Sequence, residues 1–109
     1  MSKLAGPPIH PGGLLTRELA ELQVLPSQLA TAIGVPPNRI TQILKGTREV
    51  TADTAIRLGH WFGTGPEIWI DLQRDYDLRK AQESLRETLK TLPRRPRSSR
   101  GDRPAAALR

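Results

Sequence analysis

The sequence predicts an all-α domain of five helices, with a helix-turn-helix near its middle, a long C-terminal helix and a disordered basic tail. Apolar residues recur at spacings of three and four in five segments, which is the pattern of helices with one buried face. Two of these segments are short, and only Gly34, Val35 and Pro36 separate them. The tail, residues 93–109, is rich in arginine and proline.

Residues 28–46 contain the two short helices. Gly34 follows the last apolar residue of the first helix, where a helix end favours a residue that tolerates positive φ. Pro36 and Pro37 prevent this helix from continuing, because neither has a backbone N–H. Pro37 is well suited to the first position of the second helix, where an N–H would have no partner. Two helices joined by such a turn form the helix-turn-helix motif, whose second helix enters the major groove of DNA.

The second short helix has one apolar face and one face of amides and cations. Its inward residues are Ile40, Ile43 and Leu44. Its outward residues include no carboxylate and are Asn38, Arg39, Thr41, Gln42 and Lys45. Amide side chains near the start of a recognition helix pair with adenine, which nominates Asn38 and Gln42 as base readers. Arg39 and Lys45 are equally suited to phosphates. The alternative is an ordinary helical hairpin that does not bind DNA, because such hairpins also have a polar outer face.

One helix is expected before this motif. From Pro11, three leucines at spacings of four and three share one face, and residues 1–10 are assigned to an N-terminal arm. The second helix then begins at Pro26. Its predicted cap residue, Leu25, lacks the side-chain oxygen that usually accepts a bond from the first turn.

A fourth helix is expected after the motif. Thr51 is its cap residue, since a threonine oxygen can accept an N–H of the first turn. Trp61 lies next to Phe62, which belongs to the buried stripe, so Trp61 points sideways and is a candidate interface residue. Trp69, in the helix that follows, is assigned to the core.

The start of the last helix has two alternatives: a capping box formed by Thr64 and Glu67, or Gly65 as the cap residue. Its apolar stripe continues to Leu92, so the helix would be roughly 38 Å long at 1.5 Å per residue. Either it breaks near Tyr76, or its leucines pack on a partner, most simply a second copy. The folded domain is thus assigned to residues 11–92. The candidate interface residues on this helix are Tyr76, Leu85 and Leu89.

Most of the net charge of +6 belongs to the tail. Residues 93–109 contain six arginines and one aspartate, a net +5, which leaves +1 for residues 1–92. With so few apolar groups the tail is expected to be disordered. Two interpretations of the tail remain: it attracts DNA phosphates nonspecifically, or it is a solvated segment without a function.

The composition argues against several other classes of protein. The chain has no cysteine, no apolar run long enough to cross a membrane, and no apolar core of a signal peptide near its start, which is consistent with a cytoplasmic protein. His10 and His60 are the only histidines, whereas a metal site needs three or four ligands. We therefore expect no metal, no cofactor and no enzymatic activity.

Three stretches of the chain resemble HigA-type antitoxins. They are HPG at residues 10–12, GVPPNRITQILKG at 34–46 and TADTAIRLGHWFGTGPEIWIDLQ at 51–73, of which the last is the most specific. These antitoxins are relatives of the phage-repressor class of five-helix DNA-binding domains. The resemblance implies a homodimer that neutralises a RelE-like (HigB-type) ribonuclease toxin and represses its own operon by binding double-stranded operator DNA. The alternative is a stand-alone dimeric helix-turn-helix regulator without a toxin partner.

The resemblance also implies roles for individual residues. Base reading carries over onto Pro37, Asn38 and Gln42, and backbone contact onto Lys45, Thr47 and Arg48. The full set of candidate backbone contacts is Ser27, Arg39, Thr41, Lys45, Thr47 and Arg48. One departure is the entry of the second helix, where Leu25 and Pro26 replace the usual Ser-Gln pair and its phosphate contact.

Overall fold

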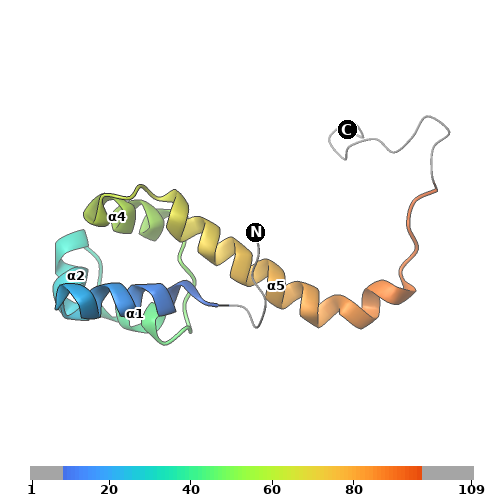
Figure 1. Cartoon of the computed structure of the whole chain (residues 1–109), viewed down its shortest axis with the longest axis horizontal. Coiled ribbons are helices and arrows are strands. Elements are labelled where there is room, and N and C mark those ends of the chain that lie inside the picture. Colours follow the sequence, from blue (N-terminus) through green and yellow to red (C-terminus); the bar gives the residue numbers. More distant parts are fainter. Residues whose placement is uncertain (1–8, 97–109) are drawn as a thin grey trace.

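The computed structural model describes residues 9–96, and this part of the chain contains five helices and no strand. The helices are α1 (Pro11–Leu22), α2 (Pro26–Ile33), α3 (Pro37–Leu44), α4 (Ala52–Phe62) and α5 (Glu67–Thr91). The first four helices and the beginning of α5 form one body, and the rest of α5 extends away from it (Figure 1). The predicted all-α class with five helices and a long last helix is confirmed. The tail prediction falls mainly on residues 97–109, which lie outside the described residues.

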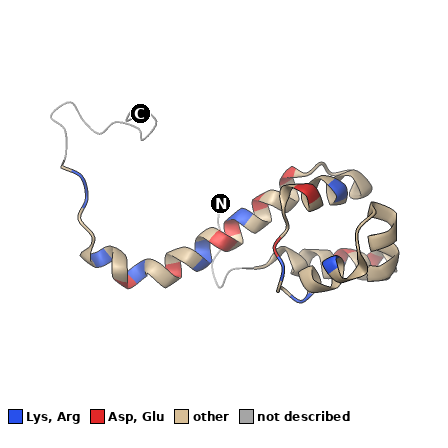
Figure 2. Ribbon diagram, turned by 180° about the vertical axis from the view of Figure 1, so that it is seen from behind, with Lys and Arg blue, Asp and Glu red and all other residues tan. Residues whose placement is uncertain are grey.

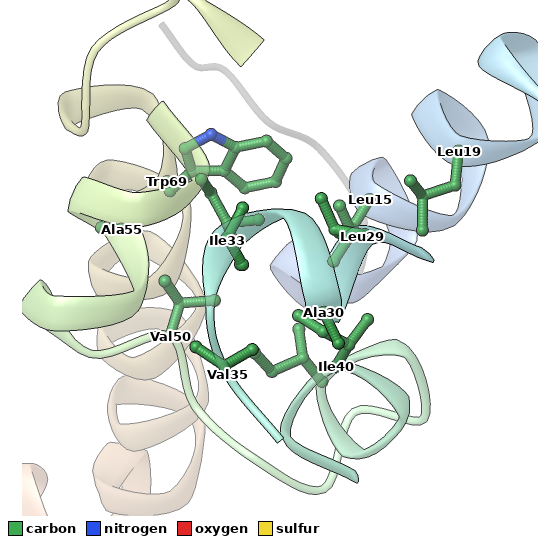
Figure 3. Packing of buried hydrophobic residues seen from close by; sticks show 12 residues of the cluster. Leu15, Leu19, Leu29, Ala30, Ile33, Val35, Ile40, Val50, Ala55 and Trp69 are labelled. Atoms are coloured by element: carbon green, nitrogen blue, oxygen red, sulfur yellow. The ribbon is translucent and has the colours of Figure 1, made fainter. Parts of the chain in front are cut away.

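One cluster of apolar side chains, to which all five helices contribute, forms the core (Figure 3). Leu15, Leu29, Ile40 and Leu58 have no exposed surface, and Trp69 is 2% exposed. The Trp69 ring lies against Phe62, with 5.3 Å between the ring centroids. The assignment of Trp69 to the core is therefore confirmed.

Two helix caps show how the sequence starts these helices. The Thr51 hydroxyl oxygen accepts the backbone N–H of Thr54 at 3.4 Å, as predicted for the start of α4. At the start of α2 the side chain of Leu25 makes no cap bond, but its backbone N–H donates to Oε1 of Gln28 at 2.8 Å. Gln28 thus supplies one half of a capping box at a helix start whose cap residue has no side-chain oxygen.

Gly12 lies where α1 crosses α3. A Cβ atom at this position would lie 2.1 Å from the backbone oxygen of Ile43, far inside van der Waals contact. Only a residue without a side chain permits this approach, which brings the start of α1 directly onto the end of α3. The crossing therefore fixes the position of α3 in the body.

His10 belongs to the folded body, although the sequence suggested an arm that ends at this residue. Its Nδ1 atom accepts the backbone N–H of Gly12 at 2.9 Å, which caps α1. Its ring also meets the Tyr76 ring of α5 edge-on, with 4.9 Å between the centroids. His10 thus joins the start of α1 to α5. Residues 1–8 of the predicted arm lie outside the described residues.

We expect the protein to lose stability between pH 7.5 and pH 5 through His10. Burial holds the pKa of His10 below its ordinary value of 6.5, against the opposing effects of a hydrogen bond with the Arg48 backbone and the charge of Asp77. The folded state therefore binds the proton more weakly than the unfolded chain. The resulting stability is complete above about pH 6.5 and falls as the pH drops through the lowered pKa, because protonation also removes the Nδ1 acceptor of the cap.

This expectation is tested by urea denaturation at several pH values, with His10→Asn as the control. Asparagine caps a helix well but does not titrate, so the free energy of unfolding of this variant should change less between pH 7.5 and pH 5. All other titratable groups are common to both proteins. Equal pH dependence in the two proteins would show that His10 does not contribute.

The last helix is continuous past Tyr76, which excludes a break there. Its start matches neither predicted alternative: Pro66 occupies the cap position, and the Thr64 hydroxyl donates to the carbonyl of Gly65 at 2.9 Å, so no capping box forms. The buried Gln73 ties the helix to the body, because its Oε1 accepts the backbone N–H of Val50 at 2.7 Å.

Residues 80–91 of α5 are all exposed, and Arg79 is the last residue of the helix that is partly buried. The distal half of α5 therefore contacts no other described helix (Figure 1).

Candidate nucleic-acid interface

The helix-turn-helix is formed by α2, a three-residue turn and α3, as predicted. Gly34 ends α2 with a φ of +75°, a conformation that glycine adopts without strain. Pro37 is the first residue of α3. Ile40 and Ile43 have no exposed surface, so the opposite side of α3 faces outward. Burial of one face thus presents the polar residues of the other.

The outward face of α3 carries the predicted base readers. Pro37 and Asn38 are exposed at the first turn, and Gln42 is half-buried one turn later. Thr41 is exposed between them, and its hydroxyl donates to the backbone oxygen of Asn38 at 3.3 Å. Lys45 follows directly after the helix and is also exposed.

The turn after α3 brings three of the predicted DNA-contacting residues together. Nε of Arg48 donates to Oε1 of Gln42 at 2.7 Å. The Thr47 hydroxyl donates to the backbone oxygen of Gln42 at 3.2 Å. Gly46, with a φ of +79°, reverses the chain between them. One predicted base reader and two predicted backbone contacts therefore form a single hydrogen-bonded group.

Arg39 belongs to a second group, which the sequence analysis missed. Its Nη1 lies 3.2 Å from Oδ1 of Asp53 in α4, and Nε of Arg57 lies 2.7 Å from the same oxygen. The hydrogen bond from Arg57, followed by the positive charges, holds the pKa of Asp53 below its usual value. Arg57 also donates to the carbonyl of Ile33 at 2.8 Å, at the end of α2. The four-residue spacing of Asp53 and Arg57 in the sequence could have predicted their ion pair, because residues four apart are neighbours on a helix surface.

The remaining candidate residues lie elsewhere on the molecule. Ser27 is exposed in the first turn of α2. Trp61 is half-buried and lines a shallow hollow of about 320 Å³ together with Ile56. Tyr76 packs on His10, whereas the interface candidates Leu85 and Leu89 are exposed on distal α5.

Charged residues are distributed differently over the body and the long helix. Basic segments mark the turn between α3 and α4, and acidic and basic residues alternate along α5 (Figure 2). Within residues 9–96 no three His, Cys, Asp or Glu side chains are grouped as metal ligands would be. No helix in the same range combines the length and apolar character needed to cross a membrane. The exposed polar face of α3 is therefore the main candidate site.

Comparison with known proteins identifies the family. Residues 16–69 match the helix-turn-helix family model HTH_3. A solved addiction module antidote protein of a HigA family from Coxiella burnetii is 42% identical, with a TM-score of 0.79, and the match covers 83% of this chain and 100% of that chain. The chain belongs to the HigA family. This result confirms the resemblance seen in the sequence and places the chain among regulatory proteins rather than enzymes.

Two further relatives show how widely the similarity extends. Pseudomonas aeruginosa antitoxin HigA, solved with the higBA promoter, is 35% identical with a TM-score of 0.77, and the match covers 80% of this chain and 96% of that chain. Virulence-associated protein I of Dichelobacter nodosus is 41% identical over 78 residues, which are 71% of this chain and 72% of the relative.

Proposed function

We propose that this chain is an antitoxin that neutralises a RelE-like (HigB-type) ribonuclease toxin and represses its own operon as a cytoplasmic homodimer. The observation that carries the proposal is the exposed polar face of α3 in a fold shared with a HigA protein solved with its promoter. The proposed base readers are Pro37, Asn38 and Gln42. The proposed backbone contacts are Ser27, Arg39, Thr41, Lys45, Thr47 and Arg48.

Asn38→Ala is expected to weaken binding to the operator about ten- to hundredfold, because a lost side chain–base pair is worth ~1–3 kcal/mol. Binding to unrelated DNA should change little, since Asn38 carries no charge. Fluorescence anisotropy with the operator and with a scrambled duplex measures both effects.

Lys45→Ala is the matched control for this measurement. Lys45 is exposed beside the same face, and its positive charge attracts the phosphates of any DNA sequence. Its loss should weaken both duplexes alike and reduce the salt dependence. An equal loss on both duplexes for Asn38→Ala would remove Asn38 from the base readers.

The proposed homodimer uses distal α5. Leu78, Leu85, Leu89 and Leu92 are about half exposed, at 53%, 47%, 54% and 53%. At 3.6 residues per turn Leu78, Leu85 and Leu89 share one side of the helix, and Leu92 follows as its C-terminal cap residue. A second copy of the chain would cover these leucines. It would also supply the second recognition helix that binding to two half-sites requires.

Replacing Leu85 and Leu89 together by glutamine is expected to raise the dimer dissociation constant at least about a hundredfold, from roughly 3 kcal/mol of lost burial. The fold should persist, because both side chains lie outside the core. Sedimentation velocity measures the dissociation constant. The matched control replaces Glu83 and Glu87, on the opposite side, by glutamine; an equal change in both variants would contradict this interface.

The toxin partner is tested with the small open reading frame adjacent to this gene. Expressed alone, its product should arrest growth, and co-expression of this chain should restore growth and give a stable complex on a sizing column. The Asn38→Ala variant should still neutralise the product while repressing the operon less. Absence of both toxicity and a complex would instead establish the stand-alone dimeric regulator.

A further inference from the structure

Gln42 does not face the solvent as a freely rotating amide. Its Oε1 accepts from Nε of Arg48 at 2.7 Å, while its backbone oxygen accepts the backbone N–H of Thr47 at 2.9 Å. Both partners come from the turn that follows α3. This turn therefore holds both the side chain and the backbone of Gln42.

The bond to Arg48 determines which way the amide is turned. A guanidinium group has only donors, so the atom of Gln42 that faces it must be the oxygen. Turning the amide over would place two donor groups against each other. The NH₂ group of Gln42 is consequently fixed on the side away from Arg48, where it can donate to a ligand.

We propose that Arg48 is a positioning residue that orients the Gln42 amide, so that Gln42 selects base edges with a hydrogen-bond acceptor and excludes cytosine. This inference rests on the proposed DNA-binding function. In the major groove guanine, adenine and thymine each present an acceptor, whereas cytosine presents only its N4 donor. An NH₂ group facing cytosine would set a donor against a donor. Arg48 thus contributes to specificity without touching a base.

The test is selection from a pool of randomised DNA duplexes, followed by sequencing. Gln42→Ala first identifies the base position that Gln42 reads, as the position whose preference disappears. The intact protein should disfavour cytosine there by roughly ten- to hundredfold. Arg48→Ala should lose this discrimination at the same position and keep the preferences elsewhere. Gln42→Glu, which can still accept from Arg48 but presents an acceptor to the base, should change the preference toward cytosine.

Lys45→Ala is again the matched control, because it removes one exposed cation that makes no bond to Gln42. It should weaken all sequences alike and leave the base preferences unchanged. The same behaviour in Arg48→Ala would overturn the inference and leave Arg48 as a phosphate contact. A preference of the intact protein for cytosine at that position would also overturn it. Failure of the intact protein to select any sequence would instead overturn the proposed function.

Discussion

Gly12→Ala is expected to lower the free energy of unfolding by about 3 kcal/mol. The added methyl group would meet the Ile43 backbone oxygen at 2.1 Å, and backbone cannot move aside as a flexible side chain does. Relief requires α1 to shift away from α3, which loosens the core between them, and overpacking of this kind typically costs about 1–3 kcal/mol. Urea denaturation followed by circular dichroism measures the change.

Gly13→Ala is the matched control, one residue further along the same helix. The nearest atom to its added methyl group would be Cγ2 of Ile9 at 3.8 Å, an ordinary contact. Since alanine favours a helix over glycine by roughly 0.8–1 kcal/mol, this variant should be equally or more stable than the original protein. Similar stability of the two variants would mean that the crossing at Gly12 is not tight.

Trp69→Ala is expected to lower the free energy of unfolding by ~3–5 kcal/mol, the usual range for a large buried aromatic residue. Trp69 is 2% exposed and fills the space between α5 and the other helices. Its Nε1 has no hydrogen-bond partner within the described residues, so its value lies in packing. Trp69→Phe, which keeps a ring beside Phe62, should lose much less stability.

Trp61→Ala provides the comparison for this prediction. Trp61 is half-buried and lies edge-on to Phe62, with 4.9 Å between the ring centroids. Its loss should lower the free energy of unfolding less than the loss of Trp69 does, because Trp61 is only partly buried at the edge of the core. Both variants are measured by denaturation followed by far-ultraviolet circular dichroism. A larger loss for Trp61→Ala than for Trp69→Ala would reverse the assignment of core and surface.

The helices of the body were predictable because their signals are local. Apolar spacing identified each buried face, and Gly34, Pro37 and Thr51 marked helix ends through conformational and capping preferences that depend on few neighbours. The start of α5 was harder. Its Thr64 and Glu67 fit a capping box in sequence, but Pro66 lies at the cap position instead.

The partners of individual side chains were less predictable, because they depend on the path of the chain in space. The candidate residues of α3 followed from its period, but the bond between Gln42 and Arg48 depends on the turn after the helix. The pairing of Arg39 with Asp53 joins two helices. His10 looked like part of an arm, and its ring contact lies on α5, far away in the sequence.

Because α5 is uninterrupted, the number of residues between the body and the last leucines determines how far away these leucines lie and in which direction they point. A helix advances 1.5 Å and turns about 100° with each residue, so removal of one residue beyond the body would swing the leucines by that angle. Removal of seven residues, which is close to two full turns, would shorten the helix by about 10 Å and would return the leucines almost to their original direction. The number of residues in α5 thus sets both the distance and the relative orientation between the polar face of α3 and any partner that binds the distal leucines.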